Sequence, residues 1–230
     1  QKESGEIITI NTESGLASDK VRTTLNLSDG SYAAATGAGV NIISENEVLE
    51  VLDAQKGVKN SEILCLAQRS DGTLLMGSDG DGIYAYKDGS VTRYSRADGL
   101  SSEVVMRLVA DPSNEDAFFI VTSNRIEYME KDGTIYTLEK FPCADNFDII
   151  FDSDDNAWIL SGVGIYVVPL DTLLDEESEL EVTFFDASGG LPCTATANSH
   201  SCASSDDILY IAGSIGVISV NMKDVIEEKA

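Results

Sequence analysis

The sequence predicts an all-β protein built from repeated, four-stranded antiparallel units, and three observations lead to this prediction. Segments that begin with glycine and an apolar residue start at Gly15, Gly57 and Gly99, and the spacing is 42 residues both times. Each start leads into a short apolar stretch. The stretches that follow are separated by turns rich in Asp-Gly and Ser-Asn. A repeat of this length with four short β-segments is the sequence signature of a β-propeller blade.

Each repeat is expected to hold its strands in the same order. The first strand follows the glycine start, as in the segments 21–27, 63–67 and 104–110. A polar Ser-Asp-Gly turn leads to the second strand, and a corner of small residues such as Gly77–Gly82 leads to the third. Glycine suits these turns because it adopts positive φ at no steric cost.

Two further copies of the unit are legible, so the chain is predicted to be a single domain of about five blades. These copies have third strands that begin at Ile165 and Val217, and the fourth repeat carries an acidic insertion at 174–181. The tail from Met222 is the only candidate for a helix. The repeats run over about 15–56, 57–98, 99–141, 142–188 and 189–221, and an N-terminal strand is expected at 6–12.

The fifth repeat shows no fourth strand after Val220. Residues 6–16, EIITINTESGL, match residues 90–100, SVTRYSRADGL, in which the outermost strand of one repeat leads into the next. We therefore expect the N-terminal strand to pair with residues near 215–220. This pairing would close the ring and leave no unpaired sheet edge. Deleting residues 1–12 should then destabilise or aggregate the protein. The alternative is that the five repeats are a fragment of a larger ring.

The charge of the chain limits its partners. Forty acidic residues against fifteen basic ones give a net charge of −25, which would repel nucleic acid and anionic bilayers. We expect no nucleic-acid binding. The charge leaves cations, neutral molecules such as sugars, and basic partners open as ligands of this chain. No apolar run approaches the roughly 20 residues of a membrane helix, so any membrane anchor would lie outside this chain.

Three motifs resemble chemical sites, and each is better explained by the fold. The segment Asp152–Trp158 alternates oxygen-bearing side chains as a calcium loop does, but it lacks the glycine and the bidentate acid of that loop. Gly77–Gly82 has the glycines of a phosphate loop without the lysine or helix. His200 is the only histidine, and we place it in the first strand of the fifth repeat. We expect no metal and no cofactor.

The four cysteines form no CxxC motif, which excludes a zinc ribbon. Cys143 and Cys193 each follow a proline and occupy equivalent positions in neighbouring repeats, so a disulfide between them is one alternative. Buried or idle thiols are the interpretation that we favour.

The predicted topology places a candidate binding surface. In each blade the repeat start and the corner between the second and third strands lie on one face, and the two hairpin turns lie on the other. Loops held by a rigid scaffold are where recognition usually occurs. Polar residues that differ between repeats on this face are the predicted ligand-binding residues, here called the rim residues: Lys20, Arg22, Asn60, Asp81, Glu103, Arg107, Asn124, Arg125 and Asn146, with Glu62, Asp79 and Asp145 beside them.

The repeat unit GLSSEVVMRLVADPSNED, continued by FFIVTSNRIEYM, resembles the repeat of two-component regulator propellers, as do SDGTLLMGSDGDGIYAY and DDNAWILSGVGIYVV. The aromatic position of that repeat is Trp158 in the fourth copy and Tyr210 in the fifth, and the resemblance covers about residues 6–221. It implies the extracytoplasmic sensor part of a membrane-anchored bacterial signalling protein with a histidine kinase or diguanylate cyclase effector. Members of the family can sense carbohydrates and often dimerise. Their rings usually have seven blades, so five copies are a departure.

The predicted function is therefore a non-catalytic, extracytoplasmic, ligand-sensing propeller that binds a small polar ligand, for example a carbohydrate, or a protein partner. No nucleophile motif is present, and the acids cluster in solvated turns, whereas general acid–base catalysis needs acids with pKa values separated by burial. A surface or scaffold propeller that binds proteins is the alternative. A propeller lyase or hydrolase is a third alternative. The sequence leaves open whether the chain forms a homodimer.

Overall fold

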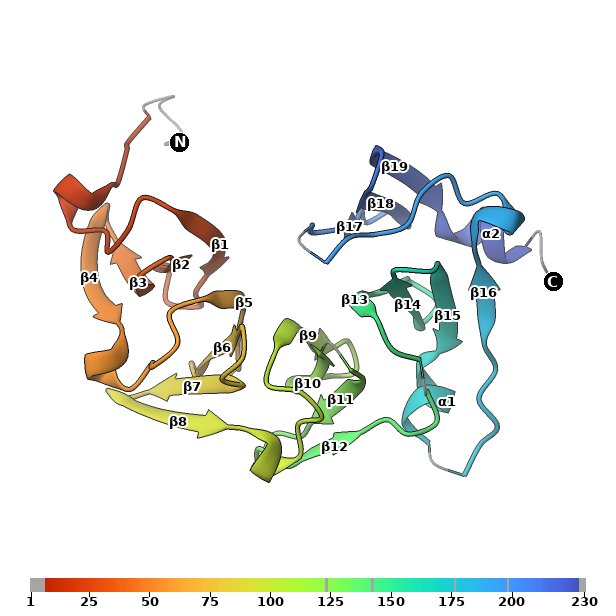
Figure 1. Ribbon diagram of the computed structural model, residues 1–230, viewed down its shortest axis with the longest axis horizontal. Helices are drawn as coiled ribbons and strands as arrows, with labels where there is room; N and C mark the ends of the chain where they lie inside the picture. The colour runs from red at the N-terminus through yellow and green to blue at the C-terminus, as the bar shows by residue number, and fades with distance from the viewer. Residues whose placement is uncertain (1–6, 123, 142, 176, 198, 228–230) are drawn as a thin grey trace. The chain divides into compact units, whose positions relative to one another are not determined.

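The computed structural model describes residues 7–227 except 123, 142, 176 and 198, and this part of the chain is all-β. Its strands form five antiparallel sheets, four with four strands and one with three (Figure 1). Strands that are neighbours in a sheet are also consecutive in the sequence, so each sheet is a meander. The prediction of an all-β fold is confirmed.

The sheets follow one another along the chain. The first holds β1 (Val21–Asn26), β2 (Tyr32–Thr36), β3 (Gly39–Ser44) and β4 (Glu47–Leu52), and the second holds β5 (Ile63–Gln68), β6 (Leu74–Ser78), β7 (Ile83–Lys87) and β8 (Ser90–Tyr94). The third holds β9 (Val105–Asp111), β10 (Asn114–Thr122), β11 (Ile126–Met129) and β12 (Ile135–Thr137). The fourth holds β13 (Asn146–Phe151), β14 (Asn156–Ser161), β15 (Ile165–Pro169) and β16 (Thr183–Phe185), and the fifth holds β17 (Cys202–Ala203), β18 (Ile208–Gly213) and β19 (Gly216–Asn221).

The chain divides into two compact units, residues 1–108 and 109–230. In the first unit, Val40 and Leu52 of the first sheet pack against Met76 and Tyr84 of the second in one buried apolar cluster. Two such clusters lie among the described residues of the second unit. One joins the third and fourth sheets, and the other joins Trp158 of the fourth sheet to the fifth. Apolar faces of successive sheets therefore bury each other within each unit, which is the main source of stability.

Four of the repeat starts are preceded by a single turn of 3-10 helix that the strand pattern did not predict. These turns are η1 (Thr12–Ser14), η2 (Ala54–Lys56), η3 (Arg96–Asp98) and η4 (Ala187–Gly189). Each begins with a side chain that accepts a hydrogen bond from the backbone of the turn, and each ends at a glycine with φ between 93° and 115°. The capping side chains lie four residues before these glycines, at Asn11, Asp53, Ser95 and Asp186.

The corner between the second and third strands also repeats. A buried hydroxyl at the end of the second strand donates a hydrogen bond to a carbonyl at or just before the start of the third strand, over 2.8–3.0 Å. The pairs are Thr36 with Gly39, Ser78 with Gly82, Thr122 with Arg125, and Ser161 with Gly164. Gly213 holds the equivalent position in the fifth repeat, and so this corner has no such hydroxyl.

The strand predicted at 6–12 is not formed by the residues that the structure describes. Residues 7–11 are in no strand, and residue 12 begins η1. The fifth sheet accordingly has three strands rather than the four that closure would give. Closure of a ring therefore stays a prediction, and residue 6 lies outside the described residues.

Two short helices occur after third strands. α2 (Met222–Glu227) lies in the predicted tail, whereas α1 (Leu170–Leu174) begins just before the acidic insertion and was not predicted. α1 forms because Leu170 and Leu173 are buried on one side of it. All four cysteines are free thiols, so Cys143 and Cys193 are not joined. Within the described ranges, no helix is both long and apolar enough to cross a membrane.

A buried carboxylate links the fourth sheet to the end of the fifth. Asp207 accepts hydrogen bonds from the backbone nitrogen and the hydroxyl of Ser153, at 2.9 and 2.6 Å, and its other partner is Lys223 of α2 at 3.0 Å. The Ser153 bonds, followed by the Lys223 ammonium, lower the pKa of the Asp207 carboxyl. The same ion pair raises the pKa of Lys223.

Replacing Asp207 with asparagine should therefore destabilise the protein at neutral pH. The folded-state pKa is lowered, so the ionised carboxylate stabilises the fold fully above the unfolded pKa of about 4 and loses this effect as the pH falls through the folded pKa. The difference in Tm between wild type and variant should be constant from pH 7 to pH 5 and shrink below about pH 4. Asp206→Asn, at an exposed neighbour, is the control and should leave Tm unchanged.

Candidate binding rim

The loops that carry the rim residues meet within the first unit. The side-chain nitrogen of Asn60 donates to the carbonyl of Asp79 at 2.7 Å, and the backbone nitrogens of Gly80 and Gly82 both donate to the carbonyl of Glu103. The corner of the second repeat thus contacts both the start of its own repeat and the start of the third. This convergence was expected from the topology of a four-stranded meander.

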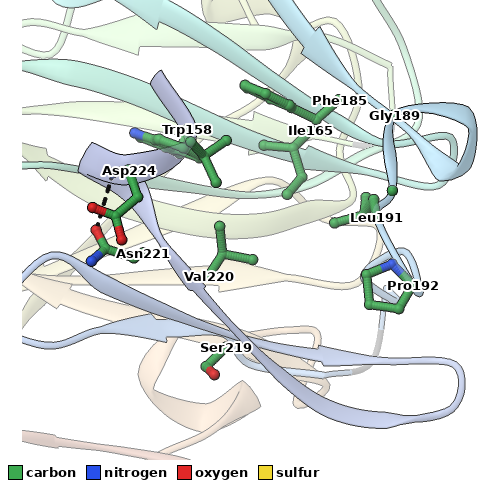
Figure 2. Close-up of a pocket in the computed structure, with 12 residues that line it drawn as sticks. Trp158, Ile165, Phe185, Gly189, Leu191, Pro192, Ser219, Val220, Asn221 and Asp224 are labelled. Carbon is green, nitrogen blue, oxygen red and sulfur yellow. Dashed lines mark hydrogen bonds between the residues drawn. The ribbon is translucent and has the colours of Figure 1, made fainter. Parts of the chain in front are cut away.

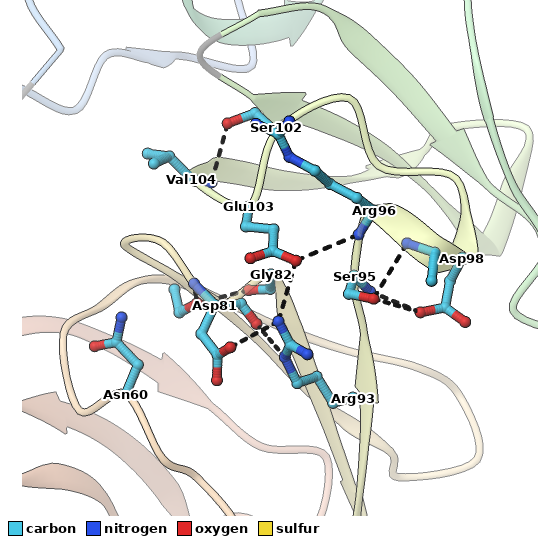
Figure 3. A network of polar contacts seen from close by, with 12 residues as sticks. Asn60, Asp81, Gly82, Arg93, Ser95, Arg96, Asp98, Ser102, Glu103 and Val104 are labelled. Carbon is cyan, nitrogen blue, oxygen red and sulfur yellow. Dashed lines mark hydrogen bonds and ion pairs between the residues drawn. The ribbon is translucent and has the colours of Figure 1, made fainter.

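Arg93, which the sequence analysis did not single out, is the centre of this cluster (Figure 3). Its guanidinium lies 2.7 Å from the carboxylate of Asp81 and 3.1 Å from that of Glu103, and its Nε donates to the Asp81 carbonyl at 2.9 Å. Glu103 also accepts from the backbone nitrogen of Arg96. A bridging arginine between two carboxylates fixes both of them, because its donors form a rigid planar fork.

Tyr84 holds the other side of the Asp81 carboxylate. Its hydroxyl donates to Asp81 and accepts from the backbone nitrogen of Asn60, at 2.9 Å for the second bond. Burial, with the hydrogen bond to Asp81, raises the pKa of Tyr84 to about 12. The phenol therefore stays a neutral donor at neutral pH. Asn60, Asp81 and Glu103 are consequently held in place by a network of contacts within the first unit.

The two N-terminal rim residues are less tightly held. The Lys20 carbonyl accepts a hydrogen bond from the backbone nitrogen of Gly37, and its side chain is exposed. Arg22, in β1, lies 3.5 Å from the carboxylate of Glu62 in the next repeat start. An exposed pair of this kind contributes little to stability.

Two predicted rim residues are buried, which differs from the exposed position expected for them. Arg107 lies within β9, only 8% of its surface is exposed, and it donates to the carbonyl of Met106 at 2.7 Å. Asn146 begins β13, is fully buried, and donates to the carbonyl of Cys143 at 2.9 Å. Arg107 falls in the strand predicted at 104–110, and β9 is buried on both faces around it. Asn146 was expected at the start of the fourth repeat, and β13 begins at it. Neither presents its side chain to a ligand at the surface.

Asn124 and Arg125 form the corner between β10 and β11 in the second unit. Asn124 is exposed and Arg125 is half-buried, and both backbone nitrogens donate to the hydroxyl of Thr122. The corner hydroxyl therefore fixes the backbone of this loop, and the side chain of Asn124 faces solvent.

The calcium-like segment is a turn whose carboxylate is occupied by protein donors. Asp152 accepts hydrogen bonds from the backbone nitrogens of Asp154 and Asn156, and from the indole nitrogen of Trp158 at 2.8 Å. Gly77–Gly82 likewise is the corner between β6 and β7 rather than a cradle at a helix. His200 is exposed and precedes β17 instead of lying in it, which corrects the expected strand position.

Comparison of the sequence with protein families finds no matching family, and comparison with curated proteins finds no match either. Comparison of the structure does find similar folds. The extracellular domain of the proposed hybrid two-component system BT3049 from B. thetaiotaomicron has a TM-score of 0.76 at 18% identity. The match covers 98% of this chain and 30% of that one.

Two other solved structures are similar at lower identity. PorZ, a surface component of the type-IX secretion system of Porphyromonas gingivalis, has a TM-score of 0.66 at 12% identity, over 98% of this chain and 35% of that one. Virginiamycin B lyase from Staphylococcus aureus has a TM-score of 0.53 at 15% identity, over 86% of this chain and 73% of that one.

This chain thus spans about a third of the length of the first two proteins. At these identities the structural similarity shows a shared fold alone. It does not assign the functional residues of those proteins to positions of this chain. The comparisons therefore place the chain's fold among those of extracellular domains of signalling proteins, a secretion-system surface component and a lyase.

Proposed function

We propose that this chain is a non-catalytic, extracytoplasmic sensor module of a membrane-anchored bacterial signalling protein. Its five sheets act as blades of a β-propeller, and its rim binds a small polar ligand. The similarity over 98% of the chain to the extracellular domain of a two-component system supports this proposal. The sequence resemblance to two-component regulator propellers points the same way. Histidine kinase and diguanylate cyclase effectors belong to the proposal through that resemblance alone.

The observation that carries the ligand part of the proposal is the Arg93 network. Arg93 contacts Asp81 of one repeat and Glu103 near the start of the next, so residues that differ between repeats are held at fixed positions. Pre-organised polar groups lose less conformational entropy when they bind a ligand. Carboxylate, amide and guanidinium groups together suit the hydroxyl groups of a neutral saccharide, which a net charge of −25 would not repel.

A panel of saccharides and amino acids screened by thermal shift tests this proposal. A ligand present at 100 times its Kd stabilises the fold by about 2.7 kcal/mol, and for a chain of this length each kcal/mol raises Tm by about 2–4 °C. The shift should be lost in Asn60→Ala and kept in Lys87→Ala, a control at the hairpin end of the same sheet. The absence of any shift, with partner binding also unchanged in Arg22→Ala and Arg125→Ala, would remove the rim from consideration.

A protein-binding scaffold is the second candidate. The similarity to PorZ over 98% of this chain favours it, because that protein is described as a surface component of a secretion system. In this case the same rim would bind a protein, and a homodimer is one form of such a contact. Pull-down of a defined partner that Asn60→Ala abolishes, with no small-molecule shift, would favour the scaffold over the sensor.

A further inference from the structure

The fourth repeat differs from the earlier ones in the connection between its third and fourth strands. This connection spans residues 45–46 in the first repeat, 88–89 in the second and 130–134 in the third, whereas it spans 170–182 in the fourth. It begins with α1 and continues as the acidic insertion. Long connections on a compact scaffold are places where binding surfaces commonly occur.

A groove of about 380 Å³ lies beside this connection, within the second unit. The segment 136–140, in and after the outer strand β12, forms one side of the groove, and Leu173 and Leu174 of α1 form the other (Figure 1). Leu138 and Leu173 are buried, and Tyr136 and Leu174 are half-buried. The groove therefore offers an apolar surface on which one large side chain can pack.

Lys140 ties the acidic insertion to this groove. Its ammonium group donates hydrogen bonds to the carbonyl of Asp175, the C-cap of α1, and to that of Ser178 at 2.5 Å. A lysine suits this place because the last carbonyls of a helix lack partners within the helix. The charge of Lys140 is thus used by backbone carbonyls of the insertion and not by its carboxylates.

The border of the groove is acidic. Four exposed carboxylates lie in the segments that form or adjoin it: Glu139, Asp175, Glu177 and Glu179. Among the described residues, none of these four forms an ion pair with a lysine or arginine. The chain has no lysine or arginine between Lys140 and Lys223, and Lys223 pairs with Asp207. A basic partner would therefore be attracted to this border and would relieve the repulsion among its carboxylates.

Another groove of the same unit, beside β19, lacks this combination (Figure 2). It has a volume of about 370 Å³, and Trp158, Phe185, Leu191 and Val220 are among the residues that line it. Asp224 is the one carboxylate in that lining. Its surface does not select a partner by charge, whereas the groove beside α1 joins an apolar surface to an acidic border.

We propose that the groove between β12 and α1 binds a segment of a protein partner in which lysine or arginine residues flank one large apolar side chain. The apolar side chain packs between Tyr136 and Leu174, and the flanking basic residues lie against the acidic border. A second copy of this chain suits the groove poorly, because two chains with a net charge of −25 repel each other. The proposal does not involve the Arg93 network, so it stands or fails independently of a ligand at the rim.

Short fluorescent peptides test this proposal by anisotropy with the whole chain. One peptide has a central leucine between lysines, the second has serine in place of the leucine, and the third has glutamates in place of the lysines. The leucine peptide should bind, and the serine peptide should bind about tenfold more weakly because it buries no apolar side chain. The glutamate peptide should not bind.

Two double variants separate the border of the groove from the charge of the whole chain. Glu177→Gln with Glu179→Gln should weaken binding of the leucine peptide about fivefold. Glu45→Gln with Glu47→Gln, at two exposed carboxylates of the first unit, changes the net charge by the same amount and should leave the affinity nearly unchanged. All four positions are exposed, so the variants should fold as the wild type does.

Leu174→Asp separates apolar packing from electrostatic attraction. It removes one side of the groove and adds a negative charge, so packing in the groove predicts weaker binding of the leucine peptide, and charge attraction alone predicts tighter binding. Tighter binding, equal weakening by the two double variants, or no binding of the leucine peptide would each overturn the proposal. A dimer of the wild type that Glu177→Gln with Glu179→Gln dissociates would also overturn it, because a second copy would then occupy the groove.

Discussion

Replacing Trp158 with alanine is expected to cost about 3–5 kcal/mol of unfolding free energy, the largest effect of any single substitution considered for this chain. The side chain is fully buried, its ring stacks on Phe185 with centroids 6.1 Å apart, and its indole nitrogen donates to Asp152. Removing it leaves a cavity between the fourth and fifth sheets and takes away one of the hydrogen bonds to the Asp152 carboxylate, whose Oδ2 still accepts from the side chain of Asn156. Urea denaturation monitored by circular dichroism measures this loss.

The equivalent residue of the fifth repeat supplies the control. Tyr210 is 42% exposed and lies outside the buried cluster that contains Trp158, so Tyr210→Ala should cost less than half as much as Trp158→Ala. Equal losses would mean that both aromatic residues lie in similarly packed cores, and that the exposed face of the fifth sheet is covered in solution.

The second large effect is expected for Gly82→Ala. Gly82 has φ of 74°, and an added Cβ would clash with the backbone carbonyl of Tyr94. The left-handed conformation costs an alanine about 1–2 kcal/mol, and the clash adds the cost of displacing the β8 backbone. We expect a total of about 3 kcal/mol, near the upper range of destabilising point mutations, measured as a fall in the midpoint of urea unfolding.

Gly80→Ala separates the two contributions. Gly80 has φ of 103° and no atom within 4 Å of an added Cβ, so this variant should show the conformational cost alone. If both variants lose the same free energy of unfolding, the close approach of the Tyr94 carbonyl to Gly82 does not contribute to the cost of the substitution.

The strands were predictable from the sequence because the 42-residue spacing repeats the same alternation of apolar stretches and glycine turns. The four one-turn helices were not predicted, although their signal is present as a polar residue four positions before the starting glycine. Strands are predicted from apolar residues that recur at regular intervals. A capping residue followed by three exposed residues shows no such recurrence. The position of residues 7–11 could not follow from the sequence, since an edge strand needs a partner as well as a pattern.

The rim was predictable in part. Topology placed Asn60, Asp81 and Glu103 together, because loops at one end of a meander must lie near one another. It could not find Arg93, whose side chain reaches the rim from an outer strand. It also could not foresee the burial of Arg107, because β9 is covered on both faces for most of its length. Sequence patterns locate backbone segments, and the reach and burial of long side chains depend on packing.

The corner hydroxyls have a consequence for local unfolding. In the first four repeats a side-chain hydroxyl joins the end of the second strand to the start of the third, so opening that corner breaks one more hydrogen bond than the backbone pairing alone. The fifth corner has Gly213 instead and lacks this bond. Native-state fluctuations should therefore begin at the fifth repeat, at a free energy well below that of global unfolding.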